Sequence, residues 1–288
     1  MPPAERFSRF VAIDWSGAKG SRHKGIAVAM CGPGDAAPDL VHPPAGFWSR
    51  QGVADWLVDQ AASAPVLFGF DFSFAPPRIA RGSYLPGETV PASAKPFWRY
   101  VDAHCPDPDL GAASFLESLH RRHFYFGIAD GVKADFLHNR VCELRYNASG
   151  GSKLSTVYDA IGAAQVAKAS FAGMRLLHHV APKVPVWPFD PLPATGSLIV
   201  EIYTSIAARA AGRPRNRSKI RDGETLDAAL AVLGSQPHTP LARYDDHATD
   251  AIVTAAWLRH VHKAPQYWSP PGLTSQIAKS EGWTFGII

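Results

Sequence analysis

Three short apolar runs along the chain each carry an acidic residue at or near their end. They cover residues 9–15, 66–72 and 197–203, and the acids are Asp14, Asp71 and Glu201. Short, continuous apolar runs that stop at turn residues are typical of buried strands. Another apolar run at 25–30 follows the first and ends at Gly-Pro-Gly, so these two predict a β-hairpin, and a third strand is expected at 40–42.

Helical spacing of apolar residues predicts the elements between and after these strands. The expected helices cover residues 53–58, 155–178, 206–211, 224–233 and 245–260. Residues 78–193 are helical and irregular, and end in a proline-rich extended connector. We interpret 78–193 as a large, mostly helical insertion within a single α/β domain that spans residues 1–288.

The composition is that of a globular protein. With 288 residues, 46% of them hydrophobic, the chain can bury a full-sized core. No stretch approaches the roughly 18 uncharged apolar residues that span a bilayer, and residues 1–6 lack the order of a signal peptide. We therefore expect a cytoplasmic protein with no membrane partner. Cys31, Cys105 and Cys142 are far apart and odd in number, which indicates neither a disulfide framework nor a cysteine zinc site.

The placement of the acids predicts a metal site. An ionised carboxylate at the end of an apolar strand is costly unless it is paired, hydrogen-bonded or bound to a cation. If their strands are neighbours, Asp14 and Asp71 project at one sheet edge. Asp246 and Asp250 are four residues apart and so share one helix face. Grouped carboxylates select Mg²⁺ or Mn²⁺, and two such ions about 3.5–4 Å apart can promote hydrolysis of a phosphodiester.

Several of these acids also have a structural interpretation, which the sequence leaves open. Asp245 or Asp246 stands where a helix is capped, and Asp71 can accept backbone hydrogen bonds at the end of its strand. Glu201 can pair with an arginine of the basic run at 213–221.

Four segments together resemble an uncharacterised domain family of predicted ribonuclease-H-like nucleases. They are residues 11–17 (VAIDWSG), 69–76 (GFDFSFAP), 200–203 (VEIY) and 245–251 (DDHATDA). The resemblance covers most of the chain and implies a mixed five-stranded sheet flanked by helices, with a metal site at one sheet edge. It implies that Asp14, Asp71 and Asp250 are the metal ligands.

One position departs from that pattern. Many ribonuclease-H-like nucleases carry an acid three residues before the final one, and this chain has His247 there, with Asp246 one place earlier. His247 can ligate a metal or carry a proton, or it can be a solvated residue at the start of a helix. The substitution therefore leaves both an active and an inactive site open.

Basic residues are candidates for contacts with nucleic acid. Lys19, Arg22 and Lys24 lie in the first hairpin beside Asp14, and Arg213, Arg215, Arg217 and Lys219 alternate along the basic run. Such charges suit a phosphate path, although charge runs are also common on solvated surfaces. Aromatic residues such as Trp98 and Phe124 can stack on bases or form the core of the insertion.

These observations lead to three hypotheses of function. The first is a Mg²⁺- or Mn²⁺-dependent nuclease in which Asp14, Asp71 and Asp250 hold metal, assisted by Asp246, Glu201 or His247. The second is a catalytically inactive module on the same fold that binds nucleic acid or a protein. The third is a nucleotide-binding, actin-like ATPase, because residues 14–20 between two strands resemble the first phosphate hairpin of that group, although no second phosphate loop is present.

Overall fold

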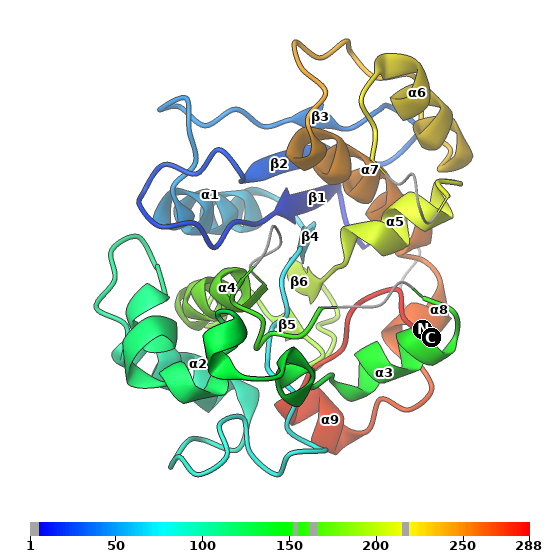
Figure 1. Cartoon of the computed structure of the whole chain (residues 1–288). Coiled ribbons are helices and arrows are strands. Elements are labelled where there is room, and N and C mark those ends of the chain that lie inside the picture. Colours follow the sequence, from blue (N-terminus) through cyan, green and yellow to red (C-terminus); the bar gives the residue numbers. More distant parts are fainter. Residues whose placement is uncertain (1–5, 152–154, 162–165, 215–218) are drawn as a thin grey trace.

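A mixed six-stranded sheet forms the centre of the computed structural model, which describes residues 6–151, 155–161, 166–214 and 219–288 (Figure 1). The strands are β1 (Arg9–Asp14), β2 (Ala27–Cys31), β3 (Asp39–Leu40), β4 (Val66–Phe70), β5 (Val186–Trp187) and β6 (Leu198–Glu201). Their order across the sheet is β3-β2-β1-β4-β6-β5. β2 pairs antiparallel with β1 and β3, whereas β1, β4, β6 and β5 run parallel.

The predicted hairpin is confirmed, but the expected number of five strands is wrong. The additional strand, β5, lies within residues 78–193 and pairs with β6. It has only two residues and sits in the proline-rich connector, so no apolar run of strand length marks it in the sequence.

Helices connect the strands and cover the sheet. They are α1 (Arg50–Ser63), α2 (Ala94–Ala103), α3 (Val141–Ala148), α4 (Val166–Val180), α5 (Thr204–Ala210), α6 (Gly223–Val232), α7 (Asp246–Val261), α8 (Pro265–Trp268) and α9 (Ser275–Ser280). Short helical turns are η1 (Phe115–Leu119), η2 (Arg121–His123), η3 (Ile128–Asp130) and η4 (Lys133–Phe136).

The helix predicted at 155–178 is confirmed only in its later part, because α4 begins at Val166. Residues 155–161 contain one turn and an isolated β-bridge to Tyr125. Tyr125 N donates to Tyr158 O at 2.8 Å, and Ala160 N donates to Tyr125 O at 3.0 Å. A partner distant in the chain therefore replaces the helical hydrogen bonds of this segment.

The sheet separates two apolar cores. Val11 and Ile13 of β1 face the core built with α1, α2 and α4, whereas Phe10 and Ala12 face the core built with α5, α6 and α7. Alternate residues of a strand point to opposite faces, and both faces of this sheet are covered by helices. Continuous apolar runs in the central strands follow from this arrangement.

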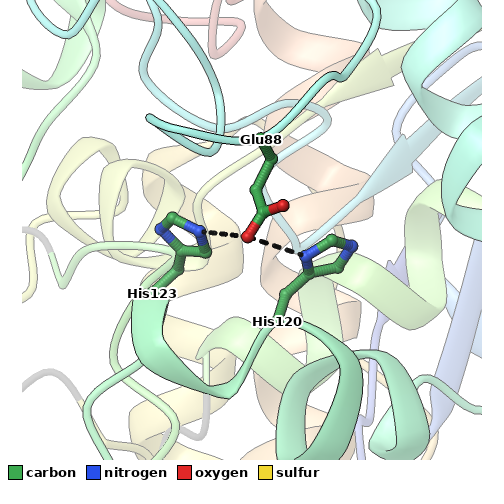
Figure 2. A group of neighbouring side chains, drawn as sticks. All are labelled: Glu88, His120 and His123. Atoms are coloured by element: carbon green, nitrogen blue, oxygen red, sulfur yellow. Dashed lines mark hydrogen bonds and ion pairs between the residues drawn. The ribbon is translucent and has the colours of Figure 1, made fainter.

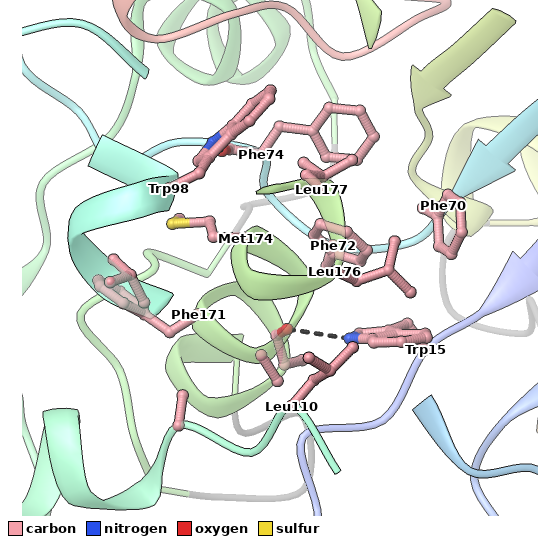
Figure 3. Close-up of a cluster of buried hydrophobic side chains, with 14 of the residues drawn as sticks. Trp15, Phe70, Phe72, Phe74, Trp98, Leu110, Phe171, Met174, Leu176 and Leu177 are labelled. Atoms are coloured by element: carbon pink, nitrogen blue, oxygen red, sulfur yellow. Dashed lines mark hydrogen bonds between the residues drawn. The ribbon is translucent and has the colours of Figure 1, made fainter. Parts of the chain in front are cut away.

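Helix α4, which the sequence places in the insertion, is part of one covering layer (Figure 3). The Trp15 indole Nε1 donates to Ala169 O at 3.1 Å, so the turn after β1 is tied to α4. A Cβ at Gly17 would lie 2.2 Å from Ala169 N, which means that only glycine permits this close approach. Segment 78–193 therefore supports the loop that follows Asp14.

Other expectations concern cysteines, aromatic residues and membranes. Cys31, Cys105 and Cys142 are buried free thiols. Trp98 and Phe124 are buried, which favours their packing role over base stacking. Within the four described ranges, no helix combines the length and apolar character needed to cross a bilayer.

Candidate functional site

Asp14 and Asp71 lie side by side at one edge of the sheet. Asp14 ends β1 and Asp71 directly follows β4, and the two strands pair in parallel with Ile13 opposite Phe70. The Asp71 N–H donates to Ile13 O at 3.0 Å, which fixes the two residues next to each other. The carboxyl ends of parallel neighbouring strands thus place both acids at one edge, as the sequence predicted.

The first turns of α7 bring a second group of residues to this edge. Asp245 caps the helix by accepting a hydrogen bond from Ala248 N at 3.0 Å, so the capping role belongs to Asp245 and leaves Asp246 for other contacts. α7 packs on β1 and β2. Asp246, His247 and Asp250 line the same pocket of about 760 Å³ as Asp14 and Asp71.

The carboxylates of this pocket perturb one another. Burial raises the pKa of Asp71 well above its ordinary value, and the charges of Asp14 and Asp250 raise it further, against a hydrogen bond from Thr204 Oγ1 at 3.3 Å. Burial also raises the pKa of Asp250, opposed by the ammonium of Lys219 and assisted by Asp14. Grouped carboxylates of this kind gain from a bound cation.

Two basic side chains pair with carboxylates of the pocket. Lys219 Nζ lies 2.9 Å from Asp250 Oδ2 and 3.7 Å from Asp246 Oδ2, and about half of its side chain is exposed. Arg221 pairs with Asp246 through Nη1. Burial acts to raise the pKa of Asp246, but the hydrogen bond from Arg221 together with the charges of Lys219, Arg221 and His247 outweighs burial and lowers that pKa.

His247 contacts the first carboxylate directly. Its Nδ1 lies 2.9 Å from Asp14 Oδ2, and this hydrogen bond raises the pKa of His247. Where the resemblance leads one to expect an acid, the structure therefore has an imidazole that pairs with an acid of the site.

Glu201 lies in the pocket wall, but its carboxylate is fully occupied by protein donors. Oε2 accepts from Phe74 N and from Arg140 Nη1, both at 2.7 Å. Oε1 accepts from Thr284 Oγ1 at 2.5 Å and from Arg140 Nη2. The sequence suggested a partner in the basic run at 213–221, and the partner is instead Arg140. We therefore assign Glu201 a structural role in the wall of the pocket.

The other basic candidates lie farther from the carboxylates. Lys19 pairs with Glu117 at 2.7 Å, the Arg22 guanidinium stacks on Phe47, and Lys24 is exposed. Arg213 is partly buried after α5, and Arg215 and Arg217 lie outside the described residues. Of the seven basic residues named in the sequence analysis, Lys219 is the one found among the described residues that line the pocket.

A buried arginine holds the loop beyond Asp14 in place. Arg50 Nε donates to Ser16 O at 3.0 Å, and its Nη2 donates to Ala18 O. Asp109 accepts from the Arg50 N–H at 3.0 Å. Neither Arg50 nor Arg140 was identified from the sequence, because isolated arginines in helical segments resemble surface residues.

Comparisons with family models, with curated proteins and with solved structures all find nothing similar.

Proposed function

We propose that this chain is a divalent-metal-dependent hydrolase of phosphodiesters, a nuclease with a ribonuclease-H-like fold. The observation that carries the proposal is the convergence of Asp14, Asp71 and Asp250 in one pocket, where burial and two neighbouring carboxylates raise the pKa of Asp71. The sheet order, with antiparallel β3-β2-β1 followed by parallel β4 and β6, supports this fold assignment.

The donor set fits Mg²⁺ or Mn²⁺. Asp14, Asp71 and Asp250 offer hard carboxylate oxygens, which these ions prefer. An ion held there by Asp14, Asp71 and Asp250 would supply polarisation of the phosphodiester, activation of the attacking water and stabilisation of the leaving oxygen. Repulsion among the three carboxylates decreases when a cation joins them, which is the reason to expect binding at this place.

The chain's own residues supply positive charge and a proton carrier. Lys219 pairs with Asp250 and Arg221 with Asp246, and these two cations would attract and orient a phosphate of the nucleic-acid backbone. His247 Nδ1 is held by Asp14, and this contact raises the pKa of His247, which favours the protonated form that can donate a proton. In this proposal His247 exchanges a proton with the substrate through its exposed ring.

A second candidate function is a non-catalytic module that binds nucleic acid. It is favoured by the internal partners of two of the carboxylates: His247 pairs with Asp14, and Lys219 pairs with Asp250. Cationic side chains in these places neutralise part of the charge that a metal would otherwise balance. Such a module binds nucleic acid in a salt-dependent manner, and binding survives a chelator.

The test is a cleavage assay with matched variants. The parent, Asp14→Asn and Asp71→Asn are incubated with labelled DNA and RNA, single-stranded, duplex and branched, in Mn²⁺ or in chelator. Asp59→Asn, which changes an exposed acid on α1, serves as the control. We expect metal-dependent cutting by the parent and the control, and its loss in both site variants.

Other outcomes decide against the proposal. If no substrate is cut but binding persists in chelator, the non-catalytic module is the better description. If Asp14→Asn and Asp71→Asn cut as fast as the parent, the site assignment is wrong. Saturable binding of ATP in millimolar Mg²⁺ would instead favour the hypothesis of an actin-like ATPase.

A further inference from the structure

A second cluster of possible metal ligands lies within residues 78–193. Glu88 comes from the loop between β4 and α2, His120 lies between η1 and η2, and His123 ends η2. Figure 2 shows both imidazoles pointing at the Glu88 carboxylate. Glu88 Oε1 lies 3.4 Å from His123 Nε2 and 3.8 Å from His120 Nδ1, and one ligand atom from each residue lies within 4.8 Å of the others.

One imidazole nitrogen of this cluster has no hydrogen-bond partner. His120 is 3% exposed, and its Nδ1 is buried without a partner. The other nitrogen, Nε2, lies 3.2 Å from the Tyr100 hydroxyl. If Nε2 donates to Tyr100, Nδ1 presents a lone pair toward the carboxylate. Two acceptors then face each other at 3.8 Å, and a cation bound between them would relieve their repulsion.

We propose that Glu88, His120 and His123 form a binding site for a transition-metal dication, with Zn²⁺ as the preferred ion. Two imidazoles and one carboxylate are a ligand set that zinc accepts, with one position left for water or another ligand. Bonds of about 2.0–2.1 Å in a tetrahedral site place ligand atoms roughly 3.3 Å apart. The separations of 3.4 and 3.8 Å from Glu88 Oε1 are close to this value, and the two imidazole nitrogens lie within 4.8 Å of each other, so side-chain movements that bring the imidazoles together complete the site.

The chemistry of the cluster differs from that of the carboxylate pocket. Imidazole favours zinc and its neighbours in the first transition series, whereas carboxylates alone favour Mg²⁺ and Mn²⁺. Burial lowers the pKa of both His120 and His123, which favours the neutral form that binds metal. The site therefore stands independently of the proposed nuclease function.

Arg122 competes with a metal for the same carboxylate. Its Nη2 lies 2.7 Å from Glu88 Oε1, and its side chain is 63% exposed. An exposed arginine can move into solvent at little cost, because exposed ion pairs contribute little to stability. Binding of the metal then joins the Glu88 loop to η2. Replacing this arginine by glutamine should strengthen zinc binding.

The test is a calorimetric titration of the chelator-stripped, full-length protein with Zn²⁺, repeated with Mg²⁺. We expect one tight zinc site that Mg²⁺ does not occupy. Glu88→Gln, His120→Gln and His123→Gln should each weaken zinc binding by at least the roughly 10–100-fold that loss of an outer hydrogen-bond partner costs in metal sites. Tyr100→Phe should fall within that 10–100-fold range.

Two controls separate this site from others. His179→Gln removes an exposed histidine that pairs with Asp102 at 3.2 Å, and Asp14→Asn alters the carboxylate pocket. Both should leave zinc affinity unchanged. Circular dichroism verifies the fold of each variant. If the variants of the buried histidines unfold, the zinc affinity of Glu88→Gln provides the test, because Glu88 is partly exposed. Equal zinc affinity in the parent and Glu88→Gln, or loss of the site in His179→Gln, would overturn the proposal.

Discussion

The role of Glu201 leads to a prediction that separates structural support from metal binding. Glu201 and Arg140 are both almost fully buried, and four donor groups converge on the carboxylate. In Glu201→Gln, one amide oxygen must serve these donors, while the new NH₂ group faces the guanidinium of Arg140. Arg140 then retains Glu143 as its remaining carboxylate ion-pair partner within the described residues.

The expected cost follows from the burial of this pair. Removing one partner of a buried ion pair typically costs about 3–5 kcal/mol, because the other charge stays buried without compensation. For a protein of this size, each kcal/mol corresponds to roughly 2–4 °C in Tm, so we expect a decrease on the order of 10 °C. Glu224→Gln on the exposed face of α6 is the matched control and should change stability by less than about 0.5 kcal/mol.

Guanidinium unfolding at pH 7, followed by circular dichroism, measures the free energy of unfolding of each variant. A parallel calorimetric titration with Mn²⁺ below the unfolding transition measures metal affinity. We expect Glu201→Gln to lose stability and to keep its Mn²⁺ affinity. Unchanged stability together with lost Mn²⁺ binding would refute this reasoning and make Glu201 a ligand.

Three further predictions concern the carboxylate pocket. Because the pKa of Asp71 is higher in the folded protein than in the unfolded chain, protonated Asp71 stabilises the folded state. This contribution is complete below the pKa that Asp71 has in the unfolded chain, and it is lost as the pH rises through the higher pKa of the folded state. In chelator, Asp71→Asn should therefore have a higher Tm than the parent at pH 7, and this difference in Tm should vanish near pH 4. Addition of Mn²⁺ should raise the Tm of the parent and leave that of Asp71→Asn unchanged. Lys219→Met should raise Mn²⁺ affinity up to about 5-fold by freeing Asp250, as measured by calorimetry, because exposed ion pairs contribute up to about 1 kcal/mol. Gly17→Ala should lose about 1–3 kcal/mol in guanidinium unfolding, since the new Cβ collides with Ala169 N; full stability would show that the turn relaxes freely.

The central strands and the last helix could be predicted because their signals are local. A continuous apolar run that ends at turn residues reads as a buried strand wherever it packs, and this located β1, β4 and β6. The i,i+4 spacing alone is sufficient to place Asp246 and Asp250 on one helix face. The β5 strand escaped prediction because two residues in a proline-rich segment become a strand only through pairing with β6.

The sequence by itself determined which acids stand at the ends of apolar strands, because the continuous apolar residues before each acid have to be buried and therefore form a strand of the sheet. Only the tertiary structure decided what those acids contact. Asp14 meets His247 across 233 positions of the chain, and Glu201 meets Arg140 across 61. Glu88 likewise meets two histidines of another segment. Side-chain pairing between distant segments depends on how helices pack on the sheet, and local sequence patterns do not predict that packing.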